Sequence, residues 1–204
     1  MRKLFCLCLV VSAAIAQTPG QLLRRGMDRF QEGKVEAALA DFDQVAKLDP
    51  SAAPHLWQRG IAQYYAGRFA DCKAMFESHR TVNPEDVENS AWHYLCTARA
   101  LSPAKTRQAL IPVARDGRPP MMTVLAMFGG KATPEDVLRD ANRYDDTARF
   151  FAYLYIGLYW EANGDQSKAD PWLRKASEAS RDQDYMGAVA RVHWARRLQA
   201  TKQK

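Results

Sequence analysis

The sequence predicts an all-α fold in which antiparallel helix pairs stack into a right-handed superhelix, with degenerate middle repeats and a C-terminal capping helix. The first observation is an internal repeat, because residues 19–52 and 53–86 share key positions at a period of about 34 residues. The matching pairs are Leu22 and Leu56, Gly26 and Gly60, Gly33 and Gly67, Ala38 and Cys72, Phe42 and Phe76, and Pro50 and Pro84. The second observation is that Gly and Pro are few and mostly fall where a helix is predicted to end.

Each shared position has a physical role in a helix pair. Gly26 and Gly60 lie where the first helix of a pair comes closest to the second. We expect Ala38 and Cys72 to face them. The other positions turn the chain, fill the wedge between helices or end the second helix: Gly33 and Gly67, Phe42 and Phe76, and Pro50 and Pro84. This period of helix pairs is typical of tetratricopeptide repeats (TPRs), whereas a generic helical bundle has no reason to repeat glycines at it.

The rest of the chain continues the pattern less regularly. Residues 150–183 form a third good unit, with Gly157, Gly164 and Leu173 in register. Residues 87–149 span nearly two degenerate units, with irregular places at the Gly129-Gly130 turn and at residues 116–120. Their predicted helices run from Glu88 to Leu101, from Ser102-Pro103, after Pro119-Pro120 and from Thr133-Pro134.

A final predicted helix, residues 184–200, caps the superhelix. Its outer face carries Arg191, Arg196 and Arg197, which would shield the last helix pair from water. Terminal units of solenoids need such a polar face.

The first residues have the three zones of a secretory signal peptide: the basic residues Arg2 and Lys3, an apolar run, and a small-residue end at Ala14-Ile15-Ala16. We predict cleavage after Ala16, so that residues 1–16 are the signal and residues 17–204 a single TPR-like domain. The apolar run is shorter than the about 20 residues that cross a bilayer.

Two cysteines near the start of the chain bear on lipidation. Cys6 and Cys8 lie inside the apolar run and not after it, so we expect no lipid anchor. The sequence therefore predicts a periplasmic or secreted protein with no stable membrane anchor.

The charge pattern argues against nucleic acid as a partner. The formal net charge is +6, and two of the basic residues belong to the predicted signal, so the mature chain is only mildly basic. Charges of both signs are interspersed, without a long run of Lys or Arg.

Catalytic motifs are missing from the sequence: no H-E-x-x-H, no G-x-S-x-G and no Gly-rich phosphate loop occurs. We therefore expect no catalytic residues and no cofactor. His55 and His193 are interpreted as surface or packing residues.

The state of Cys72 and Cys96 stays open at this stage. The second helix of the second unit runs antiparallel to the next helix, which places these two residues roughly opposite each other. Two separate buried thiols, a disulfide suited to an oxidising compartment, and a zinc site with His79 and His93 all fit that arrangement. We expect no metal site, because Cys72 should face Gly60 within its own repeat.

The partner-binding surface is predicted on the first helix of each unit, which lines the concave face of a TPR superhelix. Its outward positions, here called the concave strip, are apolar and aromatic: Leu23, Met27, Phe30, Trp57, Ile61, Tyr64 and Tyr65. Trp and Tyr are enriched at binding hot spots. The alternative is that the chain's N-terminus, a later helix or a dimer partner covers the strip, because an open aromatic face favours aggregation. The binding surface is then to be sought near Arg115 to Pro120.

Several stretches resemble the NlpI lipoprotein family of periplasmic TPR adaptors. They are residues 55–68, Trp92-His93-Tyr94-Leu95, the Phe128-Gly129-Gly130 turn, residues 155–159 and the Gly164-Asp165 turn. The resemblance covers nearly the whole predicted mature chain. It implies a homodimeric scaffold that brings envelope proteases and peptidoglycan hydrolases together. The family's lipidated Cys is missing here, so its outer-membrane anchoring is not implied.

Together these features predict a non-enzymatic scaffold or adaptor of the bacterial cell envelope. The expected partners are proteins such as a peptidoglycan hydrolase or a protease. The family resemblance also implies a homodimer. A homo-oligomeric structural component of an envelope or secretion assembly is the alternative. An enzyme with an unrecognised site is the third class.

The signal peptide is directly testable. Residues 1–20 fused to a reporter are expected to export it from a Gram-negative cytoplasm, and N-terminal sequencing of the exported native chain should begin at Gln17. A mature protein that still starts at Met1 would show the prediction to be wrong.

Overall fold

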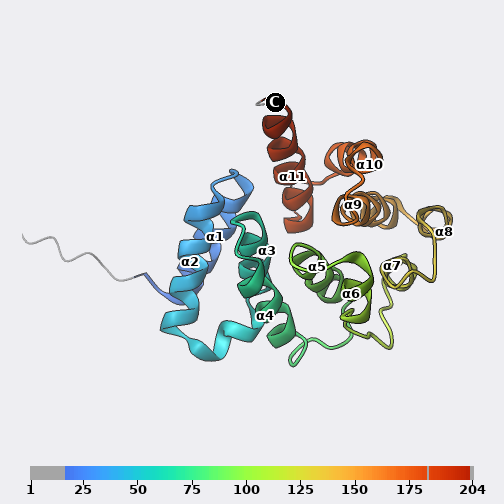
Figure 1. The fold of residues 1–204 in the computed structure, drawn as a ribbon. Helices are drawn as coiled ribbons and strands as arrows, with labels where there is room; N and C mark the ends of the chain where they lie inside the picture. Colours follow the sequence, from blue (N-terminus) through green and yellow to red (C-terminus); the bar gives the residue numbers. More distant parts are fainter. Residues whose placement is uncertain (1–16, 183, 203–204) are drawn as a thin grey trace, which may run out of the picture.

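The computed structural model describes residues 17–182 and 184–202, and every regular element in them is a helix (Figure 1). The predicted all-α class is confirmed. The predicted signal peptide, residues 1–16, lies outside the described residues. In the described ranges, none of the helices combines the length and the apolar character that a membrane span requires.

Three helix pairs form the regular parts of the structure. They are α1 (Pro19–Gln31) with α2 (Val35–Leu48), α3 (Trp57–Tyr65) with α4 (Phe69–His79), and α9 (Asp146–Ala162) with α10 (Gln166–Glu178). A short turn joins the two helices of each pair, and the two helices pack along each other. Each turn contains a glycine with positive φ: Gly33 at 75°, Gly67 at 74° and Gly164 at 82°. Residues that carry a Cβ atom are disfavoured at positive φ, which explains why these turns use glycine.

A second glycine in each pair allows the close approach of the two helices. A Cβ atom at Gly26 would lie 2.5 Å from the Phe42 ring, and one at Gly60 would lie 2.8 Å from the Phe76 ring. The same sequence separation recurs in the last pair, where Gly157 meets Leu173. The atoms nearest to such a Cβ thus belong to the larger side chains, and the expectation that Ala38 and Cys72 face these glycines stays a prediction.

The degenerate middle contains the four predicted helices, with α5 at Val87–Ala98, α6 at Pro103–Gln108, α7 at Met121–Phe128 and α8 at Pro134–Ala141. The predicted start at Thr133 is confirmed by a capping box with Asp136. Helix α5 ends before the predicted Leu101, because the chain turns there with two N–H groups bonded to the Thr97 carbonyl. A long segment without helix, residues 109–120, separates α6 from α7.

The last helix, α11 (Tyr185–Lys202), does more than cap the last pair. It packs against α10 and also against α1, so it connects the two ends of the helix array (Figure 1). Its predicted outer arginines serve these contacts. Arg197 binds Asp170 of α10 at 2.7 Å, and Arg196 donates to the main-chain oxygen of Tyr65 in α3 at 3.0 Å. Arg197 thus lies over the last helix pair as predicted, whereas the exposed Arg196 reaches across to α3.

One continuous apolar core runs from α1 to α11. A smaller cluster of Leu22, Val45 and Leu56 lies beside it at the junction of α1, α2 and α3. The buried Asp41 carboxylate adds a polar clamp, because Arg25 and Arg29 of α1 both bind it. The hydrogen bond from Arg25 is the main cause that lowers the pKa of Asp41.

The close approach at Gly60 yields a stability prediction. Gly60→Ala is expected to lower the free energy of unfolding, because overpacking costs about 1–3 kcal/mol. That loss exceeds the about 0.5–1 kcal/mol that Ala gains over Gly inside a helix. The control is Gly20→Ala in the first turn of α1, where no atom lies within 4 Å of the new Cβ and a small gain is expected. Urea unfolding of both variants measures the difference, and equal effects would contradict the packing argument.

Candidate functional site

The concave strip is largely buried by the chain itself. Phe30, Ile61 and Tyr64 are only 0%, 1% and 5% exposed. The other members are half-buried and pack against the core: Leu23, Met27, Trp57 and Tyr65. The prediction of an open aromatic groove is therefore wrong for these three buried residues. The structure instead agrees with the alternative, in which later helices of the chain cover the strip.

Helix α11 covers the strip at Phe30, Trp57 and Tyr65. Tyr64 is covered instead by Trp92 and Arg99 at α5 and by Glu161 of α9. The Tyr185 ring stacks on Phe30 at a centroid distance of 5.3 Å and meets Trp57 edge to face at 5.1 Å. Such aromatic pairs add to the free energy gained by burying their area. Two cavities remain along α3 where α11 does not fill the strip, one beside Trp57 and Ile61 and one beside Tyr64 and Tyr65.

The second of these cavities contains a hydrogen-bonded cluster, here called the His193 network, of Tyr64, Tyr65, Arg99, Glu161 and His193. The Tyr65 hydroxyl lies 2.9 Å from Nδ1 of His193, and Nε2 of His193 lies 2.8 Å from Glu161. Arg99 donates to the Tyr64 hydroxyl at 3.0 Å and to Glu161 at 3.2 Å. The network thus joins α3, the end of α5, α9 and α11.

The carboxylate decides the direction of the hydrogen bonds in this network. An ionised Glu161 only accepts, so with a neutral imidazole Nε2–H of His193 donates to it and Nδ1 accepts from Tyr65. Burial by itself would raise the pKa of Glu161, but the hydrogen bond from His193, together with the charge of Arg99, holds it below the ordinary value. Burial also raises the pKa of Tyr65, which stays protonated as a donor.

The first cavity, here called the Trp57 cavity, has a volume of about 230 Å³. Its walls are aromatic and apolar, and one side is polar. The lining comes from α3, α4, the start of α5, the segment before α7 and the start of α11: Trp57, Ile61, Phe76, His79, Asp86, Glu88, Asn89, Trp92, Arg118 and Met186. Residues far apart in the sequence therefore form a single concave site.

Three carboxylates gather around one guanidinium at the polar side of the Trp57 cavity. Arg118 binds Asp86, Glu88 and Asp116, each at 2.6 Å. Tyr155 of α9 donates to Glu88 at 2.6 Å, and the main-chain N–H of Val87 donates to Asp116 at 3.1 Å. Burial raises the pKa of Glu88 even though Arg118 and Tyr155 act to lower it.

The segment that carries Arg118 is the one named above as the fallback binding surface. Residues 115–120 have no helix of their own, and Arg118 holds them against the start of α5. The structure therefore brings the two sequence-predicted regions, the strip at Trp57 and the loop at Arg118, to the same cavity.

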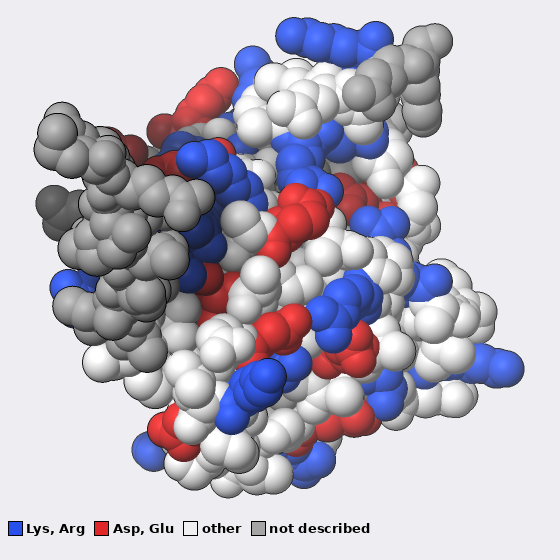
Figure 2. All heavy atoms as spheres, turned by 90° about the vertical axis from the view of Figure 1, so that its left-hand side faces the viewer, with Lys and Arg blue, Asp and Glu red and all other residues white. Residues whose placement is uncertain are grey.

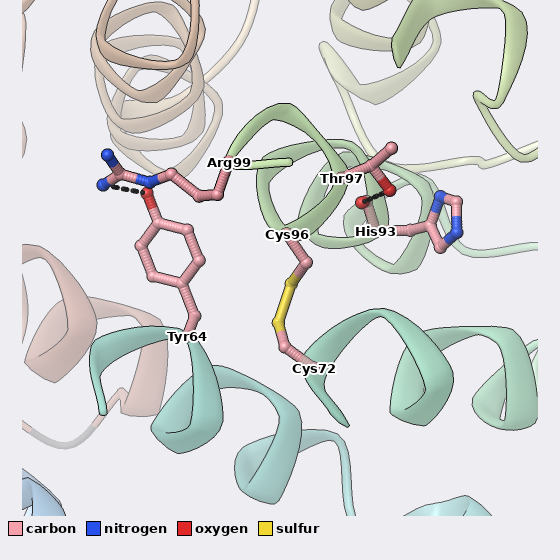
Figure 3. Close-up of a disulfide and its surroundings, with 6 residues drawn as sticks. All are labelled: Tyr64, Cys72, His93, Cys96, Thr97 and Arg99. Atoms are coloured by element: carbon pink, nitrogen blue, oxygen red, sulfur yellow. Dashed lines mark hydrogen bonds between the residues drawn. A yellow bond between two sulfur atoms is a disulfide. The ribbon is translucent and has the colours of Figure 1, made fainter. Parts of the chain in front are cut away.

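Cys72 of α4 and Cys96 of α5 are joined by a disulfide, with Cα atoms 5.9 Å apart (Figure 3). Of the three states considered for these cysteines, separate thiols, a disulfide or a zinc site, the structure has the disulfide. Neither sulfur is therefore free to bind zinc. His79 instead contacts the Pro54 main-chain oxygen at 2.8 Å. His93 points away from the disulfide, and its Nε2 lies 3.5 Å from Glu77 (Figure 3). No group of three or more potential metal ligands occurs among the described residues.

Two further surface cavities share no residue with the concave strip. An apolar one lies along the segment before α7 and includes Leu110, Val113 and Leu125, and another is lined by Trp160 and Trp172. On the face viewed from the side of α1 and α2, basic and acidic side chains alternate with uncharged surface (Figure 2).

A scan against models of known protein families finds none that matches the chain. The site is therefore interpreted from its own geometry.

Sequence reasoning missed several residues of the two cavities: Glu88, Asn89, Arg99, Glu161 and Met186. It also missed Tyr185, which covers part of the strip. One signal was available. Helix α11 is apolar on several faces, with Tyr185, Met186, Val189 and Val192 all buried, and a helix that only capped one pair would need a single apolar face. The polar members carried no such signal, because their roles depend on contacts between distant segments.

The depressed pKa of Glu161 yields a pH prediction. A carboxylate whose folded pKa lies below its unfolded value adds stability above the unfolded pKa and loses it as the pH falls through the folded one. Glu161→Gln is expected to lower the free energy of unfolding by about 1–3 kcal/mol at pH 7, because charged hydrogen bonds are lost. The difference from the native protein should shrink as the pH falls below about 4.5.

Urea unfolding from pH 7 to pH 3 measures this effect. The exposed Glu178→Gln is the matched control, with little effect expected at either pH. A Glu161→Gln difference that is constant with pH would contradict the assignment.

Proposed function

We propose that this protein is a non-enzymatic TPR-type scaffold that holds a segment of a protein partner in the Trp57 cavity. The repeat of the glycine contacts in three helix pairs supports the TPR-type superhelix. The observation that carries the function is the Trp57 cavity itself. It is concave and aromatic, has a polar side, and is built on the inner strip that TPR proteins use for binding.

The proposed location is the bacterial envelope. The signal-like residues 1–16 support export, and a Cys72–Cys96 disulfide suits an oxidising compartment. The resemblance to the NlpI family supports a peptidoglycan hydrolase or a protease as the partner. The proposal includes no nucleic acid and no stable membrane anchor.

The His193 network is the arrangement that most resembles acid–base machinery, since a tyrosine, a histidine and a carboxylate lie in line. We interpret it as a brace. Both ring nitrogens of His193 and both oxygens of Glu161 are already engaged by neighbouring side chains. A network with its hydrogen bonds satisfied holds helices together and stabilises one arrangement of them.

Partner capture tests this function. Tagged mature protein is expected to retain a specific partner from an envelope extract, and Trp57→Ala should weaken that capture by about 2 kcal/mol, as loss of an aromatic hot spot does. Trp172→Ala in the separate cavity is the matched control and should leave capture unchanged. Tyr64 is not a suitable probe, because it is buried in the core.

Circular dichroism and the molar mass of each variant accompany the capture experiment. Equal capture by the native protein and by folded Trp57→Ala would contradict the Trp57 cavity as the binding site. Self-association without any other partner would favour the homo-oligomeric alternative.

A further inference from the structure

The apolar cavity beside α7, here called the α7 groove, lies between two antiparallel stretches of chain. Near the end of α7, a side-chain carbon of Leu110 lies 3.6 Å from the Cβ position of Gly129. Near the start of α7, the main-chain N–H of Asp116 donates to the sulfur of Met122 at 3.2 Å. The groove has a volume of about 430 Å³ and is lined by Arg107, Leu110, Ile111, Pro112, Val113, Met122, Leu125, Ala126, Gly129 and Lys131.

The helical wall of the α7 groove is an apolar stripe without a helix packed on it. Met122, Leu125, Ala126 and Gly129 are spaced three and four residues apart, so they share one face of the helix. The opposite wall is the segment of residues 109–113, which has no helix and leaves the stripe open to solvent. Met122 is 37% exposed as a result. An open apolar groove of this kind is typical of a ligand site.

The charge of the α7 groove is concentrated at one end. The Nε atom of Arg107 lies 3.6 Å from the Cβ position of Gly130, and Lys131 is the next residue, so both cations are at the end of α7. Among the described residues, no carboxylate lines the groove and neither cation forms an ion pair. The groove therefore has a positive end and an apolar body, which is the complement of an anionic head and a hydrocarbon tail.

The length and chemistry of the groove narrow the ligand further. The stripe from Met122 to Gly129 covers seven residues, which at a rise of about 1.5 Å per residue is about 10 Å. Carbon–carbon single bonds of about 1.5 Å in an extended zigzag cover that length with about eight carbons. An extended peptide would need partners for its main-chain N–H and carbonyl groups, whereas the side chains along the body of the groove are apolar. A hydrocarbon chain needs no such partners.

We propose that the α7 groove binds a free fatty acid of medium chain length. The carboxylate lies at Arg107 and Lys131, and the unbranched acyl chain lies along α7 toward Met122. This inference goes beyond the proposed function, because it concerns a small ligand, and the α7 groove shares no lining residue with the Trp57 cavity.

A titration of the mature protein with octanoate tests the proposal. Octanamide is the neutral control, with the same chain and nearly the same shape. The readout is nuclear magnetic resonance of ¹³C-labelled methionine methyl groups, with Met122→Leu used to assign the Met122 signal. We expect octanoate to shift that signal in a saturable way and octanamide to bind about fivefold more weakly, a modest loss because the two cations are exposed. Affinity should rise from butanoate to octanoate and level off once the chain fills the groove.

Two variants separate the tail contact from the head contact. Ala126→Leu fills the groove with a residue of similar helix propensity, so it should keep the native Tm and weaken octanoate binding about tenfold. The exposed Ala40→Leu of α2 is its matched control. Arg107→Gln should reduce octanoate binding to the octanamide level. The exposed Arg24→Gln of α1 removes the same charge elsewhere and should bind like the native protein.

Three results would overturn the proposal: equal binding of octanoate and octanamide, full binding by folded Ala126→Leu, or a Met122 signal that octanoate leaves unshifted. If Ala126→Leu does not fold, Arg107→Gln decides alone, and native-like octanoate binding by it contradicts the assignment.

Two further arms identify other occupants. Vesicles of phosphatidylglycerol that shift the Met122 signal where octanoate does not would replace the free ligand by a membrane surface. Protein capture that Ala126→Leu abolishes, without any octanoate binding, would make the groove a protein contact. In either case the fatty-acid assignment fails, while capture that depends on Trp57 would still support the proposed function.

Discussion

The arrangement of this protein depends on the return of α11 from the last helix pair to the first. A row of stacked helix pairs exposes its inner aromatic side chains unless something covers them, and here the chain covers its own. Tyr185 stacks on Phe30 and meets Trp57, while His193 bonds with Tyr65 and Glu161. The aromatic contacts supply buried area, and the hydrogen bonds set the position of the helix along the strip.

This closure divides the inner face into two cavities of different character. In the His193 network each ionisable side chain has partners, so the network stabilises one packing of α3, α9 and α11. Beside the Trp57 cavity, Oδ1 of Asn89 and Nε1 of Trp92 are buried without partners in the described chain, at a cost to stability. The satisfied polar cluster therefore fits a structural role.

The irregular middle of the chain is what gives the Trp57 cavity its polar side. Because residues 109–120 form no helix, this segment can cross to the start of α5 and place Arg118 among three carboxylates. The Cys72–Cys96 disulfide ties α4 to α5, the two helices that carry Phe76 and Trp92 of the cavity wall (Figure 3). Departures from the repeat and a covalent cross-link therefore build the site together.

The sequence by itself determined the helical class, the main helices and the turns, because these depend on local periodicity, on capping residues such as Thr133 and on glycines such as Gly67. It also indicated the strip residue Trp57 and the loop near Arg118, each as a separate candidate. Only the tertiary structure decided that Phe30, Ile61 and Tyr64 are covered and that Trp57 and Arg118 line the same cavity. The physical reason is that both outcomes depend on contacts between α3, α5, α11 and a segment without helix, and no local pattern encodes how such distant elements meet.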